Sequence, residues 1–115
     1  MSAQEIKKNA DGTIEFRLDP EYGWYWDRDG KLTEEYYHDV MFMEDLYITF
    51  INGYGYLVDY NTRLVYGLEF EFGKSYLQTL LDDIHDCYKN DEVFVLIPFS
   101  KEESEELLIQ EENGY

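Results

Sequence analysis

Six segments of the chain carry the hydrophobic pattern or the composition of β-strands. In the first segment, Ile14, Phe16 and Leu18 alternate with polar residues, which is the period of a half-buried strand. The other segments are short runs rich in β-branched and aromatic residues, and several end at turn signals such as Asn52-Gly53. The sequence therefore predicts strands over residues 13–18, 22–27, 46–51, 54–60, 64–72 and 93–97.

Three further segments carry the start signals of helices. Ser75 and Gln78 match a capping box, which satisfies the first backbone N–H groups of a helix, and leucines follow them at helical spacing. Ser100 and Glu103 repeat this pattern, and Thr33 is followed by two glutamates that suit the first turn of a helix. We expect helices over residues 34–45, 76–89 and 101–112.

The order of these elements predicts an α+β fold. The three central strands are expected to form an antiparallel meander, with about three helices packed on this sheet. Along the last strand of the meander, Leu68, Phe70 and Phe72 would face one side, whereas Glu69 and Glu71 would face the other. We therefore expect one face of the sheet to be apolar and the other to be charged.

Length and composition set the limits of the fold. The 115 residues suffice for one core, and the 44% hydrophobic and 18% aromatic content is typical of a folded chain. Residues 1–12 hold only one sizeable apolar side chain, so we expect a flexible leader there and a single compact domain over residues 13–115. The start of the chain lacks the apolar stretch of a signal peptide, and Cys87 is the sole cysteine, which indicates a cytoplasmic location.

Candidate catalytic residues are few. The two histidines, His38 and His85, lie in no known catalytic pattern, and Cys87 would not face His85 on a helix. The sequence contains no glycine-rich motif for binding phosphate, and 26 acidic residues produce pairs of carboxylates by chance. We therefore expect a protein that is not an enzyme and that binds no cofactor.

Candidate metal sites lack the ligands that a specific site requires. With Gly30 at the sixth position of an EF-hand loop, the first and twelfth ligands would be Tyr25 and Tyr36, and neither is a carboxylate. Asp82 and Asp86 would lie one helical turn apart beside a histidine, but many acidic helices could bind a cation weakly in this way. We expect no specific metal site.

Negative charge is the strongest feature of the sequence. The 26 Asp and Glu residues against 9 Lys and Arg give a formal net charge of −17, and self-repulsion of this size opposes folding. Glu102, Glu105 and Glu106 would lie about 6 Å apart on a helix, and Glu69 and Glu71 about 6.8 Å apart on a strand. These spacings approximate those of phosphates along DNA, and the whole charge matches roughly 29 Å of duplex.

In length, acidity, tyrosine content and mixed α+β character, the whole chain resembles the small acidic bacterial DNA-mimic proteins. The resemblance is strongest to the kind that binds the histone-like protein HU. The resemblance implies a monomer that occupies the basic DNA-binding surface of HU, competes with DNA and so modulates nucleoid organisation. The carboxylates that would replace phosphates are Glu69, Glu71, Asp82, Asp83, Asp86, Glu102, Glu103, Glu105 and Glu106.

Other functions remain open at this point. Blocking the basic cleft of a nuclease toxin, a restriction enzyme or a CRISPR enzyme would use the same physics, so an immunity or inhibitor protein is the main alternative. A small enzyme would require a polar pocket with a perturbed carboxylate or histidine. The acidic residues could also serve only solubility. Nucleic acids and anionic membranes are poor partners for so negative a chain.

Overall fold

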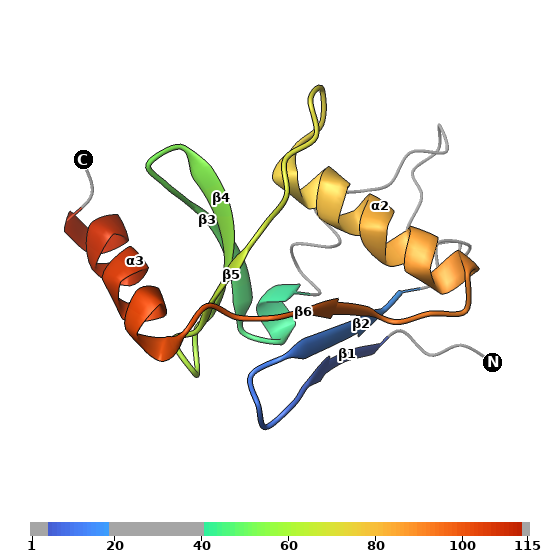
Figure 1. The fold of residues 1–115 in the computed structure, drawn as a ribbon, viewed down its shortest axis with the longest axis horizontal. Helices are drawn as coiled ribbons and strands as arrows, with labels where there is room; N and C mark the ends of the chain where they lie inside the picture. The colour runs from blue at the N-terminus through green and yellow to red at the C-terminus, as the bar shows by residue number, and fades with distance from the viewer. Residues whose placement is uncertain (1–4, 19–40, 114–115) are drawn as a thin grey trace.

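Two three-stranded antiparallel sheets form the β-structure of residues 5–18 and 41–113, which are the residues that this computed structural model describes (Figure 1). The first sheet has the strand order β1-β2-β6, and the second has the order β3-β4-β5. The α+β class is therefore confirmed, but the prediction of a single meander sheet is wrong. The strands are β1 (Glu5–Lys8), β2 (Ile14–Arg17), β3 (Leu46–Ile51), β4 (Tyr54–Asp59), β5 (Val65–Gly67) and β6 (Phe94–Leu96).

Two helices begin where the capping residues predicted. Helix α2 spans Tyr76–Lys89, and the Ser75 hydroxyl accepts a hydrogen bond of 2.9 Å from the backbone N–H of Gln78. Helix α3 spans Lys101–Asn113, and Ser100 accepts a bond of 3.1 Å from the Glu103 N–H in the same way. Residues 41–43 are also helical; the rest of the helix predicted over 34–45 lies outside the described residues, except for a turn at 44 and 45, as does the predicted strand over 22–27.

Strand β1 lies within the segment expected to be a leader. Residues 5–8 pair antiparallel with β2, with Ile6 opposite Phe16, and Ile6 packs against the main core. The turn between these strands includes Gly12 at φ +93°, a conformation that favours glycine. The sequence did not indicate this strand, because only Ile6 of its four residues is apolar and the residues therefore show no hydrophobic alternation.

The meander exists but its last strand is shorter than predicted. Strands β3 and β4 are joined by Asn52 and Gly53, both at positive φ, as a tight hairpin requires. Gly67 pairs with Tyr56, and β4 begins at Tyr54, so a longer β5 would soon have no partner strand. Residues 68–72 therefore leave the sheet, and the predicted alternation of Leu68, Phe70 and Phe72 against Glu69 and Glu71 across a strand is wrong.

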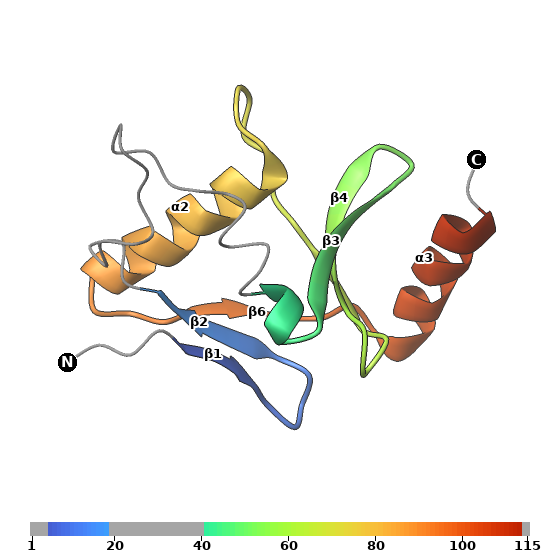
Figure 2. The same ribbon diagram turned by 180° about the vertical axis from the view of Figure 1, so that it is seen from behind.

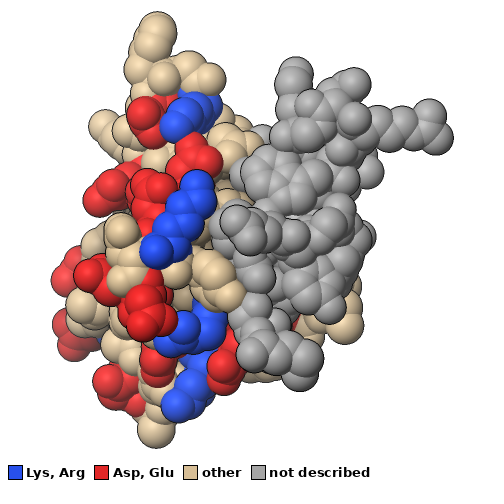
Figure 3. Space-filling model, turned by 90° about the vertical axis from the view of Figure 1, so that its right-hand side faces the viewer, with Lys and Arg blue, Asp and Glu red and all other residues tan. Residues whose placement is uncertain are grey.

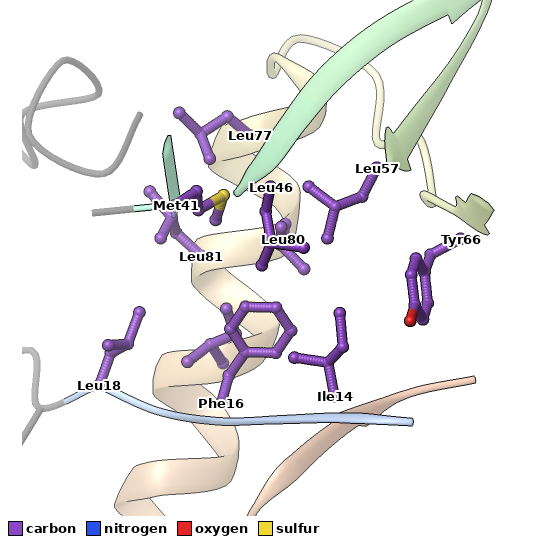
Figure 4. Close-up of a cluster of buried hydrophobic side chains, with 11 residues drawn as sticks. Ile14, Phe16, Leu18, Met41, Leu46, Leu57, Tyr66, Leu77, Leu80 and Leu81 are labelled. Carbon is purple, nitrogen blue, oxygen red and sulfur yellow. The ribbon is translucent and has the colours of Figure 1, made fainter. Parts of the chain in front are cut away.

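The main core lies between α2, the first sheet and one face of the meander (Figure 4). Helix α2 contacts β2 and β6; Leu80 and Leu81 lie above Phe16 and Ile14 of β2 in the close-up, whereas Leu77 lies at the other end of the cluster near Met41 and Leu46. The meander closes this core from the other side. Its buried side chains are those of Ile14, Phe16, Leu18, Met41, Leu46, Leu57, Tyr66, Leu77, Leu80, Leu81 and Ile84.

A second, smaller core covers the opposite face of the meander. Helix α3 contacts β3 and β5, and Leu108 is buried with Val58 and Val65. Tyr47, Tyr56, Phe99 and Leu107 pack around this group. The meander is therefore apolar on both faces, and the expected charged face is wrong because the alternate positions of β4 and β5 hold valines that α3 covers.

Three polar links join the two sheets. The Lys8 ammonium of β1 lies 3.3 Å from the carboxylate of Asp59 at the end of β4, and that carboxylate is almost fully buried. The Phe99 N–H, beyond β6, donates to the Val65 carbonyl of β5 at 2.9 Å. The Tyr66 hydroxyl donates to the carbonyl of Gly12. Each link joins the meander to the first sheet or to a segment that adjoins it, so together these contacts help to fix how the two sheets are arranged.

Candidate acidic interface

Five of the nine predicted carboxylates come together beside α2. We call this group the α2 cluster: Glu69, Glu71, Asp82, Asp83 and Asp86. The helix supplies the three aspartates, and the segment that leads from β5 to α2 supplies the two glutamates. The glutamates therefore reach this group from an irregular segment and not from the strand that the sequence predicted.

Lys74 neutralises part of the α2 cluster. Its ammonium lies 2.6 Å from the carboxylate of Asp82 and 3.1 Å from that of Glu71. These contacts raise the pKa of Lys74, with the bond to Asp82 the larger cause. Gln78 also donates to Asp82 at 2.9 Å. Lys74 was not among the predicted site residues, although an opposite charge three residues after Glu71 was a signal for an ion pair.

Asp83 is the electrostatically strained member of the α2 cluster. Partial burial, the largest cause, raises the pKa of its carboxyl because it removes water from the charged form. The neighbouring carboxylates raise the pKa further, with Glu69 the largest contributor, followed by Asp86, Asp82 and Glu71. A nearby cation would relieve this repulsion, so Asp83 favours a positively charged partner.

The other four predicted carboxylates form a separate surface on α3, which we call the α3 ridge: Glu102, Glu103, Glu105 and Glu106. All four are exposed, because Ser104 and Leu108 are the positions that α3 buries. Glu102 and Glu103 lie in the first helical turn, where negative charge stabilises the helix dipole. The ridge and the α2 cluster lie on different sides of the meander, as both ribbon views show (Figures 1 and 2).

Charges of both signs occur together on parts of the surface. Figure 3 shows the side on which α2 lies in Figure 1, and Lys and Arg side chains are interspersed with Asp and Glu along its described part. The α2 side is therefore not uniformly acidic, as the ion pairs of Lys74 also indicate. A shallow depression in the first sheet is mixed as well, since Lys7 and Arg17 line it together with Glu5 and Glu15, and this lining does not resemble a row of phosphates.

Exposed aromatic side chains adjoin the α2 cluster, and two of them, Phe70 and Phe72, were predicted to lie on a sheet face. Phe72 is 94% exposed and Phe70 61% exposed. The ring of Tyr76 lies 5.6 Å from that of Phe50 and 5.5 Å from that of Phe70, measured between centroids. Tyr76 also covers Gly55, where a Cβ atom would lie 2.5 Å from the Tyr76 ring.

The structure describes some of the residues that were considered for catalysis and metal binding. His85 is buried on α2, and Cys87 is half-buried; His38 and Gly30 lie outside the described residues. Burial, and then the charges of Glu92, Asp83 and Asp86, raise the pKa of the Cys87 thiol, which disfavours the reactive thiolate. Among residues 5–18 and 41–113, no group of three or more His, Cys, Asp and Glu side chains is placed to hold a metal ion.

Comparison with models of protein families, with curated proteins and with solved structures finds no match to this chain. Within the part of the chain that the structure describes, no helix has the length and apolar character needed to cross a membrane.

Proposed function

We propose that this protein is a DNA mimic whose carboxylates occupy the DNA-binding surface of a basic protein, with histone-like HU as the first partner. In this proposal the protein acts as a monomer, catalyses no reaction and needs no cofactor. It competes with DNA for the partner and so modulates nucleoid organisation. The resemblance to small acidic DNA mimics and the net charge of −17 both support this function.

The observation that carries the proposal is the uneven compensation of charge in the α2 cluster. Lys74 pairs with Asp82 and Glu71, whereas Glu69, Asp83 and Asp86 lie outside those two ion pairs. Placing carboxylates this close costs folding free energy, as the raised pKa of Asp83 indicates. The arginine and lysine side chains of a DNA-binding surface would recover this cost on binding, which is how a phosphate row attracts such a surface.

The α3 ridge supports the same function independently. Its four glutamates are exposed on one regular helix, which places the side-chain bases of Glu102, Glu105 and Glu106 about 6 Å apart where they are three or four residues apart. A regular spacing on a rigid element is what a row of phosphates presents to a basic groove. The ridge and the α2 cluster are two separate surfaces, so mutation can show which of them the partner contacts.

A calorimetric titration with HU tests the proposal. Purified HU is titrated into the protein at about 50 mM and about 200 mM salt, with and without a competing DNA duplex. We expect binding that weakens steeply with salt and that displaces the duplex. Absence of binding at about 50 mM salt would reject HU as the partner, and binding that leaves HU on its duplex would reject mimicry.

Three variants with equal charge locate the interface. The first replaces the ridge glutamates 102, 103, 105 and 106 by Gln, and the second replaces Glu69 and Glu71 by Gln and Asp83 and Asp86 by Asn. A matched control carries four exposed substitutions outside both surfaces: Glu5→Gln, Glu44→Gln, Asp91→Asn and Glu92→Gln. Each variant loses four negative charges. We expect the interface variant to weaken HU binding at least tenfold more than the control, and equal losses would mean that no single patch forms the interface.

A further inference from the structure

A pocket opens where the two sheets diverge. The Phe99 N–H, beyond β6, donates to the Val65 carbonyl of β5, and away from this link β5 and β6 run in diverging directions (Figure 1). The space between them has a volume of about 200 Å³, several times what one water molecule needs. Its lining comes from Gly67 at the end of β5, from Leu68 and Glu69 in the segment that follows, from β6 and from α2.

The lining combines apolar walls with two carboxylates. Leu68, Leu80 and Phe94 contribute apolar surface, and all three belong to the main core or pack against it. Glu69 and Asp83 are the charged residues of the lining, and Lys and Arg do not occur among the described residues that form it. A ligand that suits this lining has an apolar stem and a positively charged end.

We propose that this pocket receives one lysine or arginine side chain from the protein partner. The methylene groups of the side chain pack between Leu68, Leu80 and Phe94, and its ammonium or guanidinium group lies between Glu69 and Asp83. This inference deepens the proposed function and rests on it, because it assigns the anchoring contact within the same acidic surface.

The electrostatics of the pocket favour this occupant over a neutral one. The charge of Glu69 is the largest carboxylate contribution to the raised pKa of Asp83, so the two carboxylates repel each other across a partly dehydrated space. One positive charge between them turns that repulsion into two attractive contacts. A neutral side chain of the same length would gain the apolar packing but would leave the repulsion in place.

The first experiment detects the occupant without HU. A blocked Gly-Arg-Gly peptide is titrated into the isotope-labelled protein, and the backbone amide NMR signals are followed. Parallel titrations use the same peptide with Lys or Gln at the centre. We expect saturable shifts at Leu80, Asp83 and Val95 for the Arg or the Lys peptide, and none for the Gln peptide. Shifts that are scattered over all acidic surfaces, or shifts that the Gln peptide also causes, would overturn the proposal.

Charge-matched variants complete the test. The double variant Glu69→Gln/Asp83→Asn should weaken peptide binding about tenfold or more, because it removes both charged contacts while keeping the side-chain shapes. The control Asp91→Asn/Glu92→Gln removes the same charge from an exposed turn and should retain the peptide shifts. An equal loss of peptide binding in both variants would overturn the proposal that the pocket receives the side chain. Failure of HU to bind leaves the peptide result valid, so the two proposals can fail separately.

Discussion

Asp83 shows at the scale of one residue how an acidic surface costs stability. The pKa of its carboxyl is raised in the folded protein, first by partial burial and then by Glu69 and three aspartate or glutamate neighbours. The protonated form therefore stabilises the fold. This contribution is fully present below the ordinary pKa of 3.8 and is lost as the pH rises through the higher folded value.

Replacement of Asp83 by Asn should accordingly raise the thermal midpoint at pH 7, because the amide carries no charge to repel. The gain should shrink as the pH falls toward 4, where Asp83 itself takes up a proton. Thermal melts of the parent and the variant at several pH values measure the difference between their thermal midpoints. A variant that is less stable than the parent at pH 7 would show that Asp83 makes a favourable contact instead.

Asp59 is the opposite case, a carboxylate that the fold needs. Its side chain is 1% exposed, pairs with Lys8 at 3.3 Å and accepts a backbone bond of 2.9 Å from Asn61. Replacement of Asp59 by Ala should lower the free energy of unfolding by about 3 kcal/mol, since it leaves the Lys8 charge and the turn donors without their acceptor. Urea denaturation gives the value, and a loss below about 1 kcal/mol would mean that water replaces the carboxylate.

At the scale of elements, one buried hydroxyl helps to attach α3 to the meander. Ser104 is fully buried, and its oxygen accepts a hydrogen bond of 3.0 Å from the Val65 N–H of β5. Replacement of Ser104 by Ala should cost about 1–3 kcal/mol, because the buried N–H then lacks an acceptor. Hydrogen exchange should be faster at the Val65 amide, whereas the β2 amides serve as an internal control. Unchanged protection at Val65 would indicate another acceptor.

Some of the helices and strands were predictable from the sequence and others were not. Helices α2 and α3 were predictable because Ser75 and Ser100 mark their starts locally. Strand β1 was not predictable, since an edge strand is defined by its pairing with β2 and not by its own pattern. Residues 68–72 alternate like a strand, but in the register of β5 the residues from 70 onward would lie beyond the start of β4 at Tyr54. Pairing is a tertiary property that local patterns do not encode.

The candidate site was also predictable only in its local features. The acidic residues were identifiable from the sequence, but their division into the α2 cluster and the α3 ridge depends on how α3 packs against the far side of the meander. The pocket that Glu69 and Asp83 share was not predictable either. It requires β5, β6 and α2 to be positioned together, and they are distant in the sequence.

At the scale of the whole molecule, charge should govern stability. A net charge of −17 on 115 residues is self-repulsive, and salt screens this repulsion over about 10 Å at 0.1 M ionic strength. The thermal midpoint should therefore rise between about 0.05 M and 0.5 M sodium chloride. The variant in which Gln replaces the four glutamates of the α3 ridge should show a smaller rise. A midpoint that does not depend on salt would mean that local ion pairs already balance the charge.

The pairing of β2 with β6 has a consequence for synthesis on the ribosome. Phe16 lies opposite Phe94, so nearly the whole chain must emerge before the first sheet is complete. The meander contains only contacts between neighbouring strands, which form quickly. Until residue 96 is available, the edge of β2 that β6 later covers stays open, and a β1-β2 hairpin of this kind is marginal alone and prone to pair with other chains. The meander is therefore expected to form before the first sheet is complete.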